Sequence, residues 1–167
     1  MRRWMIISVV GGLGLIAGVV WLARTIWPDD AGHIRRHLSR LAQAVTFDQN
    51  PGLLGSVARG RQAAREFTAA ARVKLDFGGL GQVEGQDAIA ALAAQACQLA
   101  ASVRVTFPDA RVAVAGDSAS VEATGMADGL ACSGEAFREI REFRMRCVRE
   151  QGDWRIASVE EVRPAEQ

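Results

Sequence analysis

Residues that build metal centres and covalent cross-links are scarce in this sequence. Its three cysteines, Cys97, Cys132 and Cys147, are scattered, and none belongs to a CxxC pair. An odd set with this spacing argues against a disulfide framework and against a zinc site. We therefore expect all three to be small buried apolar residues, and we expect no metal and no cofactor.

Histidine is also rare. The two histidines, His33 and His37, lie four residues apart, a spacing that could share a metal ion on one face of a helix. The glutamate of an HExxH motif is missing, however, and no third ligand is evident nearby. We expect both histidines to lie with Arg36 and Arg40 on the solvated face of a helix.

Neither sign of charge is in excess. The sequence has 20 basic and 19 acidic residues, which leaves a formal net charge of +1. This balance excludes a strongly basic nucleic-acid binder and an acidic tail. Exposed aromatic residues that interleave with basic ones, as single-stranded nucleic acid requires, are not expected either. We therefore predict that nucleic acid is not a partner.

The N-terminus carries a long apolar run without a charged residue, from Trp4 to Ala23. A helix of that length spans roughly 30 Å, the thickness of a bilayer's hydrocarbon core. Trp4, Trp21 and Trp27 lie near the two ends, where indoles favour the headgroup zone. The sequence thus predicts a transmembrane anchor over residues 1–27, with the lipid bilayer as its partner. A cleaved signal peptide is the alternative, but Trp21 and Ala23 match its cleavage site poorly.

Two features of this segment bear on its orientation in the membrane and on its association with a second copy. Arg2 and Arg3 precede the run, and a short tail with paired arginines usually stays inside. We expect a single-pass protein of the cytoplasmic (inner) membrane, with the soluble domain on the periplasmic or extracellular side. Gly14 and Gly18 form a GxxxG motif, which either allows close approach of two helices or simply reflects a glycine-rich membrane helix.

Helical spacing recurs after the anchor. A first helix is expected from Asp29 and Asp30 to Val45, and a second opens with Asn50 as cap and Pro51 as first helical residue. The expected covered side of the second helix is Leu54, Val57 and Ala58. A third helix is expected over residues 86–100, with its buried face at Ile89, Leu92, Ala96 and Leu99.

Alternation of apolar and polar residues predicts the strands. The earlier strands are expected at residues 73–77, 103–107, 111–115 and 119–126, and residues 128–135 are expected to form a loop. The clearest pattern is a hairpin, with arms at residues 137–148 and 154–162. Gln151, Gly152 and Asp153 lie between the arms and tolerate the dihedral angles of a tight turn.

Helices followed by consecutive antiparallel strands indicate an α+β fold with helices on one sheet face. At Val83–Ile89, with a glycine before an amphipathic helix, and at Gly152–Val159, with a G-x-W-x-I strand, the chain resembles the nuclear transport factor 2-like superfamily. The resemblance implies a cone-shaped barrel over residues 28–163, a curved antiparallel sheet wrapped around helices. A polar tail, residues 164–167, follows. Some relatives, inner-membrane subunits of type IV secretion systems, are membrane-anchored scaffolds with a similar layout.

Enzymes of this superfamily provide a test for catalysis. Ketosteroid isomerase members combine a general-base aspartate with an oxyanion hole made of tyrosine and a protonated aspartate. The sequence has no tyrosine, so that oxyanion hole cannot be copied. We therefore expect no catalytic residue and a membrane-anchored, non-catalytic binding or scaffold module. The alternative is a small-molecule enzyme or ligand carrier that uses the pocket of the cone, with pocket candidates Arg61, Asp76, Glu122 and Phe143.

An arginine-rich strand offers a possible contact surface for an unidentified protein partner. Its candidate residues are Arg138, Arg141, Arg144 and Arg146. Glutamates lie among them, so cross-strand ion pairs on an exposed sheet face are the alternative explanation. A weak homodimer is also expected, in which the arginines of one copy meet the glutamates of the other and the tethered membrane helices associate.

Overall fold

The computed structural model describes residues 29–75 and 81–162. The chain divides near Asp30, and the account below concerns the second unit, Ala31–Gln167. The expected anchor and its tryptophans and glycines, Asp76, and the polar tail all lie outside the described residues. Within the described ranges, no helix combines the length and the apolar character needed to cross a membrane.

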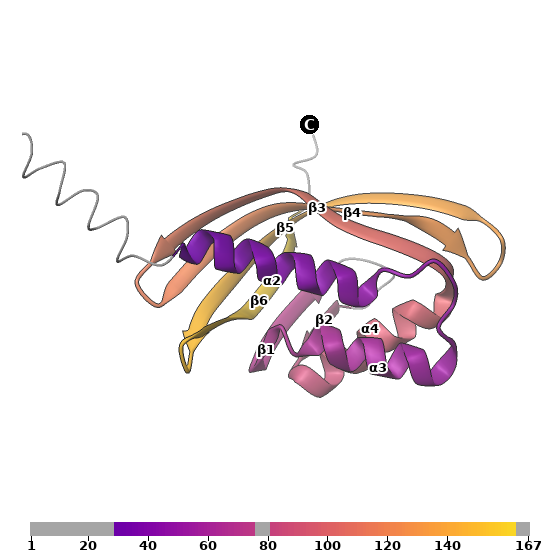
Figure 1. The fold of residues 1–167 in the computed structure, drawn as a ribbon, viewed down its shortest axis with the longest axis horizontal. Coiled ribbons are helices and arrows are strands. Elements are labelled where there is room, and N and C mark those ends of the chain that lie inside the picture. The colour runs from indigo at the N-terminus through magenta and orange to yellow at the C-terminus, as the bar shows by residue number, and fades with distance from the viewer. Residues whose placement is uncertain (1–28, 76–80, 163–167) are drawn as a thin grey trace, which may run out of the picture. The chain divides into compact units, whose positions relative to one another are not determined.

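Three helices and six strands make up the described part of the chain (Figure 1). The helices are α2 (Asp30–Val45), α3 (Gly52–Ala64) and α4 (Gln86–Leu99). The strands are β1 (Phe67–Leu75), β2 (Gly81–Glu84), β3 (Ala100–Ala115), β4 (Ser118–Ala131), β5 (Ala136–Glu150) and β6 (Asp153–Val162). The order of elements is the α+β order that the sequence predicts.

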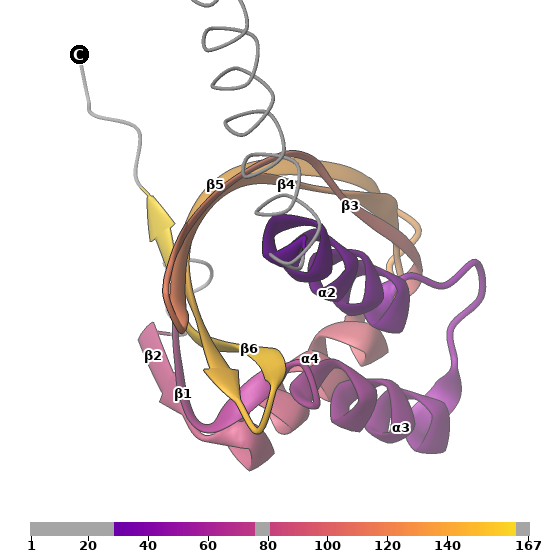
Figure 2. The same cartoon turned by 60° about the vertical axis from the view of Figure 1, so that its left-hand side comes forward.

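The six strands form one curved sheet in the order β2-β1-β6-β5-β4-β3. Figure 2 shows β3, β4 and β5 arching over α2, while α3 and α4 pack against each other below it. The expectation of a wholly antiparallel sheet is wrong at one place, because β1 and β6 run parallel. The hairpin with β5 sets the direction of β6, and the pairing of β6 with β1 joins strands far apart in the sequence.

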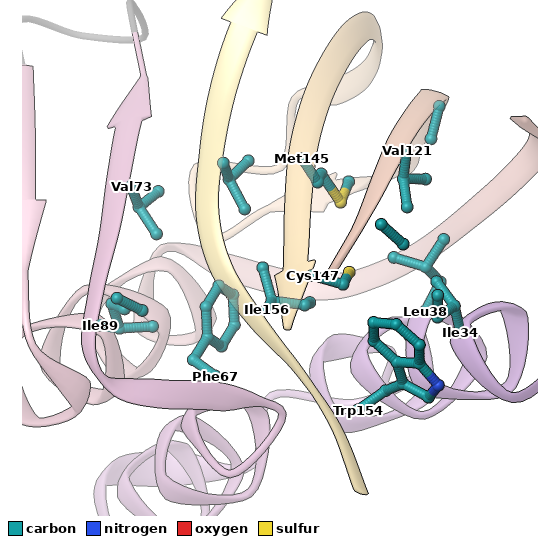
Figure 3. Packing of buried hydrophobic residues seen from close by; sticks show 14 of the residues in the cluster. Ile34, Leu38, Phe67, Val73, Ile89, Val121, Met145, Cys147, Trp154 and Ile156 are labelled. Atoms are coloured by element: carbon teal, nitrogen blue, oxygen red, sulfur yellow. The ribbon is translucent and has the colours of Figure 1, made fainter. Parts of the chain in front are cut away.

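The core lies between the concave face of the sheet and α2 (Figure 3). Ile34 and Leu38 of α2 meet Val121 of β4, Met145 of β5 and Trp154 of β6 there. Inward and outward residues alternate along β4 and β5, as the pleat requires. Leu38, Val121 and Trp154 are each at most 2% exposed, so this part of the concave face is filled by side chains.

The β5–β6 hairpin confirms the clearest sequence prediction. Glu150 pairs with Asp153, which leaves a two-residue loop of Gln151 and Gly152. Both loop residues have positive φ, 53° and 87°, the conformation of the turns that fit the twist of a hairpin. Asp153, expected in the turn, is instead the first residue of β6.

The predicted buried face of α3 is wrong, and that of α4 is right at Ile89 but wrong at Ala96 and Leu99. On α3, Leu54 is 85% exposed and Val57 and Ala58 are also exposed. The buried residues of α3 are Ser56, Gly60, Ala63 and Ala64. On α4, Ala96 and Leu99 are exposed, while Ile89, Ala94 and Cys97 are buried. The reason is that α3 and α4 contact each other closely through small residues, with Gly60 against Ala90 and Ala94.

The strands of the β3–β4 hairpin are longer than expected. Residues 103–107 and 111–115 belong to one strand, β3, whose register shifts between Thr106 and Asp109, around Pro108. The predicted loop at residues 128–135 is wrong in its first half, because β4 continues to Ala131. In the strand register Asp128 lies opposite Arg104 of β3 and opposite Arg138 of β5. Backbone pairing with a strand on each side therefore holds this polar stretch in the sheet.

Two of the three cysteines are buried, as expected, but Cys132 is exposed. Burial raises the pKa of Cys97, although the Arg59 charge opposes the rise, and burial raises the pKa of Cys147 to about 11. Thiolate is the reactive form, so burial and the raised pKa both protect these two thiols.

In the folded chain we therefore expect one thiol, Cys132, to react rapidly with the aromatic disulfide DTNB, and all three to react in urea. The colour released by DTNB measures the stoichiometry. A Cys132→Ser variant is the control and should lose the rapid phase. Rapid labelling of Cys97 or Cys147 in the native chain would contradict the packing.

Candidate functional site

A groove runs between α2 and β3, which is one of the two edge strands of the described sheet. Its volume is about 630 Å³, within the range of small-molecule sites. Leu38, Ala42, Val105, Phe107 and Ala110 supply its apolar lining. The remaining lining residues are Arg35, Ser39, Gln43, Thr46, Arg104, Thr106 and Pro108. The groove exists because α2 lies inside the curved sheet while β3 has no further strand beside it.

Two contacts close one end of this α2–β3 groove. Phe47 and Val103 exchange backbone N–H···O bonds of 2.8 and 2.9 Å as an isolated antiparallel bridge. The hydroxyl of Thr46 accepts a hydrogen bond of 3.0 Å from the Val105 N–H. The C-terminal end of α2 is thereby fastened to the edge strand, so the distance between the two walls is fixed there.

The charges along the groove are of one sign. Arg35 and Arg104 line it, and no acidic residue does. Asp128 lies opposite Arg104 on β4, but the two side chains form no ion pair, and Arg35 forms none with any described residue. Arg104 alternates with the inward-facing Val103 and Val105, so its side chain lies on the outer face of the sheet beside Asp128. Arg35 of α2 is therefore the basic residue that lines the groove without an ion pair to a described residue.

A second cluster of polar residues surrounds His37. Its ring Nδ1 contacts Glu66 Oε2, and its Nε2 lies 3.2 Å from Asp153 Oδ1. Arg40 Nε lies 3.5 Å from Glu66 Oε1. The Arg40 guanidinium also contacts the ring, with one nitrogen 2.9 Å from Nδ1 and 2.8 Å from Nε2. This His37 cluster borders a surface hollow of about 430 Å³.

The expectation that His37 lies on the solvated face of its helix is wrong, because the residue is 5% exposed. Its position follows Ile34 by three residues and precedes Leu41 by four, which places it on the inward stripe of α2. His33 is exposed, as expected. Among the described residues no group of three His, Cys, Asp or Glu side chains has an arrangement that could hold a metal ion.

Asp153 has a shifted pKa. Burial raises it, but the hydrogen bond and charge of His37, the Arg155 charge and the Trp154 N–H outweigh burial and leave the pKa below its usual 3.8. A depressed carboxyl pKa contributes stability that is present above the unfolded value and is lost as pH falls through the folded value. The side chain is 53% exposed, so solvent screening limits the contribution.

We expect Asp153→Asn to destabilise the chain by less than about 1 kcal/mol near neutral pH. The difference from the wild type should begin to shrink as pH falls below about 4, and it should disappear only when the folded chain also protonates this carboxylate. Urea unfolding at a series of pH values measures it. Asp48→Asn, at an exposed carboxylate that forms no ion pair with a described residue, is the control variant. A difference that persists unchanged to low pH would contradict this origin.

The structure does not gather the predicted pocket residues into one site. Arg61 is exposed on α3, and Asp76 lies outside the described residues. Glu122 is on the outer face of β4, opposite Arg144, whereas Phe143 is on the inner face of β5, opposite Ala123. The Phe143 ring covers Gly125, where a β-carbon would come within 2.6 Å of it. The two residues border a hollow of about 250 Å³ but have their side chains on opposite sides of the sheet.

The outer face of the sheet carries a row of alternating charges. Glu122 lies opposite Arg111 on one side and Arg144 on the other, and Arg144 lies opposite Glu160. The row ends with Lys74, whose Nζ is 3.0 Å from Glu160 Oε1. Arg144 Nε is 4.0 Å from Glu122 Oε1. Cross-strand pairing therefore accounts for this face, as the alternative sequence interpretation proposed.

The predicted arginine face contains one residue that does not belong to it. Arg138, Arg144 and Arg146 are outward-facing on β5, but Arg141 is on the opposite face. Its guanidinium lies 2.9 Å from Glu139 Oε2 and 3.0 Å from Glu161 Oε1. The reason is the two-residue period of a strand, since Arg141 is an odd number of positions from each of the others.

The fold and the match to a family model together show to which protein family the chain belongs. The curved sheet over three described helices is the α+β cone of nuclear transport factor 2-like proteins. Residues 58–160 match the model of the SnoaL-like domain, so the chain belongs to that family. The family assignment confirms the resemblance inferred from the sequence at the level of the domain.

Solved structures with the same fold include three from Novosphingobium aromaticivorans. An NTF2-like protein with a cystatin-like fold is 17% identical, with a TM-score of 0.64, over 91% of this chain and 90% of that one. A provisionally assigned aromatic ring hydroxylase is 19% identical, with a TM-score of 0.68, over 83% and 93%. A provisionally assigned scytalone dehydratase is 12% identical, with a TM-score of 0.65, over 79% and 82%. Comparison with curated proteins found no match.

Proposed function

We propose that this chain is a membrane-anchored, non-catalytic binding module of the SnoaL-like family, and that its binding site is the α2–β3 groove. The observation that carries the proposal is the contrast between the filled concave face and the open groove. Trp154, Val121 and Met145 fill the space beneath α2. Beside them, the groove offers about 630 Å³ of accessible volume with a mostly apolar lining.

The environment of the ionisable groups also supports ligand binding without catalysis. His37 contacts two carboxylates, and Arg40 lies beside one of them. A general base must reach the proton it abstracts and must not be held by stronger partners. The groove itself is lined by arginines, a serine, a threonine and a glutamine but by no histidine or carboxylate. Such groups recognise and orient a ligand more readily than they transform one.

The membrane anchor remains part of the proposal on the strength of the uncharged run from Trp4 to Ala23. We expect the full chain to stay in the membrane fraction after washing with alkaline carbonate. Reporter fusions at Gln167 should be active only outside the cytoplasm. Release by carbonate would contradict the anchor, and a reporter signal confined to the cytoplasm would reverse the orientation.

We also propose that the anchored chain forms a weak homodimer. Because the outer-face charges already pair within one copy, they add little, and exposed ion pairs are worth about 0–1 kcal/mol. The GxxxG of Gly14 and Gly18 then becomes the main contact. Crosslinking in detergent should yield a dimer, and Gly14→Ile with Gly18→Ile should remove it. An unchanged crosslink would exclude this helix contact.

A ligand screen on the full chain in lipid nanodiscs tests binding against chemistry. Compounds that raise the melting temperature should be recovered chemically unchanged, as judged by mass spectrometry after long incubation. Ala42→Leu, which narrows the groove at a residue that lines it, should abolish their effect. Ala58→Leu, at an exposed position on α3, is the control. Conversion of a stabilising compound into a product would overturn the non-catalytic proposal.

A small-molecule enzyme is the second candidate, and the buried histidine between two carboxylates is the observation that favours it. Similar structures are provisionally assigned as a hydroxylase and a dehydratase, which extends the range of compounds worth screening. If a conversion is found, His37→Gln should abolish it while ligand binding persists. A conversion that survives this substitution would exclude the His37 cluster as its site.

A further inference from the structure

We infer that α2 and α3 form a docking face for an anionic phospholipid surface, with the leucines of α3 in the headgroup layer and the arginines of both helices at the phosphates. This docking face is a different surface from the ligand groove, and the inference rests on the proposed function only through the membrane anchor. Three observations carry it: the uneven distribution of charge along the chain, the exposed apolar side of α3, and the short linker between these helices and the predicted anchor.

Charge is balanced over the whole chain but not within it. Residues 31–65, which include α2 after its first residue and all of α3, contain six arginines and a single carboxylate, Asp48. Asp29 and Asp30 immediately precede this segment and reduce its positive excess without removing it. Residues 66–167 contain 11 basic and 16 acidic residues. Positive charge is therefore concentrated in the two helices, and a basic segment of this kind is attracted to anionic lipid.

Most of these arginines are free to bind an external anion. Four of them are exposed and form no ion pair with a described residue: Arg35, Arg36, Arg61 and Arg65. Asp153 borders the same hollow as Arg36 but forms no ion pair with it. A guanidinium group binds a phosphate through two parallel hydrogen bonds, so each of these side chains suits a lipid headgroup.

Two other arginines hold α2 and α3 side by side. Arg59 of α3 donates hydrogen bonds of 3.1 and 2.8 Å to the carbonyls of Ala44 and Thr46, at the C-terminal end of α2. Arg40, four residues before Ala44, lies 3.5 Å from Glu66, just after α3. The two helices therefore run beside each other in opposite directions, as Figure 1 shows. Their exposed arginines belong to one surface.

The exposed side of α3 is apolar at its start and basic at its end. Leu53 and Leu54 are 67% and 85% exposed, and Val57, one turn later, is also exposed. Arg61 and Arg65 follow Val57 at steps of four residues, which places them on the same side of the helix. The helix has no acidic residue. Exposed leucines followed by arginines are typical of helices that lie in the membrane interface.

The predicted anchor favours the bilayer over other negatively charged partners. Its apolar segment ends near Trp27, and α2 begins at Asp30, so the linker spans roughly 10 Å at most. Tethering keeps the two helices at a high effective concentration beside the lipid surface, so individually weak contacts are sufficient. An acidic protein or a nucleic acid would meet the same arginines without this advantage.

Fluorescence quenching by brominated lipid tests the inference on the full chain, in nanodiscs that hold one chain each. The probe is the fluorophore NBD on Leu54→Cys, in a Cys132→Ser background that removes the exposed native thiol. The matched control carries NBD on Ser120→Cys, an exposed position on the outer face of β4. The lipids are brominated phosphatidylcholine and phosphatidylglycerol in equal parts. We expect quenching at position 54 to be at least twofold stronger than at position 120.

The same label tests the role of charge. Replacing phosphatidylglycerol with unbrominated phosphatidylcholine should reduce quenching at position 54 at least twofold, and Arg36→Ala combined with Arg61→Ala should do the same. Arg138→Ala combined with Arg146→Ala removes equal charge from the outer face of the sheet and should leave the quenching unchanged. Equal quenching at positions 54 and 120, or quenching at position 54 that does not depend on phosphatidylglycerol, overturns the inference.

The outcomes also separate other occupants and the anchor itself. If a second copy covers the leucines, NBD at position 54 becomes shielded as the chain concentration rises in detergent and is not quenched in single-chain nanodiscs, which overturns the inference. Release by alkaline carbonate would reject the anchor alone. Flotation of the chain with vesicles of the same two lipids, lost in the Arg36→Ala and Arg61→Ala variant, would then still support docking. Retention after carbonate with equal quenching at both positions would reject docking and leave the anchor standing.

Discussion

Replacing Trp154 with alanine should cost about 3–5 kcal/mol of unfolding free energy, the range measured for buried aromatic residues cut back to alanine. Trp154 is 1% exposed and is the largest of the fully buried side chains. Its ring lies in the cluster beneath α2, and the Arg149 guanidinium lies 4.8 Å from the ring centroid on another side. The substitution therefore leaves a cavity where sheet and helix meet. A loss of this size is a large fraction of the ordinary stability of a domain, about 5–15 kcal/mol.

Urea unfolding of the full chain in nanodiscs, followed by the circular dichroism of the sheet, measures this effect without relying on tryptophan fluorescence. Leu54→Ala is the matched control, since Leu54 is 85% exposed and should change stability by less than about 0.5 kcal/mol. A loss below about 1 kcal/mol for Trp154→Ala would mean that the core collapses around the gap or that the ring is not buried.

The position of Trp154 illustrates what local patterns in the sequence establish. The β5–β6 hairpin could be predicted because its determinants are neighbours: alternating arms, and a loop of Gln151 and Gly152 that accepts positive φ. The parallel pairing of β1 with β6 could not, since it joins residues such as Val73 and Val159 that no local pattern connects. Only the complete topology shows that the returning strand lies between β1 and β5.

The candidate site was harder to foresee than the fold. His37 looked solvated beside Arg36 and Arg40, although its spacing from Ile34 already placed it on the inward stripe. Its partners are Glu66, in the turn before β1, and Asp153, at the start of β6, and no sequence pattern brings them together. The groove depends on β3 being the edge strand, which is a property of the sheet as a whole.

The charges show why composition alone misleads about partners. The arginines of β5 looked available to an acidic partner, but the outward ones lie in a sheet face where Glu122 and Glu160 flank Arg144. Arg35, by contrast, lines an apolar groove and forms no ion pair with a described residue. Recognition therefore depends on which arginines lack a nearby carboxylate and not on where arginine is most frequent.

Replacing Gly60 with alanine should destabilise the chain, although the same change stabilises an ordinary exposed helix by about 1 kcal/mol. A β-carbon at Gly60 would overlap the Ala90 carbonyl oxygen and lie 3.0 Å from the Ala94 backbone nitrogen. Backbone atoms on α4 cannot rotate away as a side chain can, so α3 and α4 would have to separate. Overpacking of this kind costs about 1–3 kcal/mol, and we expect a net loss near 2 kcal/mol in urea unfolding.

The reverse substitution two residues away is the matched control. Ala58 is exposed on α3, so Ala58→Gly should also destabilise the chain, by about 1 kcal/mol, through helix propensity alone. Gly60→Ala adds a methyl group and Ala58→Gly removes one, and we expect each substitution to lower the free energy of unfolding. The reason is that α3 packs on α4 by its small residues and leaves Leu54 and Val57 exposed. If Gly60→Ala raises stability instead, the helices do not approach this closely, and the exposed apolar side of α3 would need another explanation.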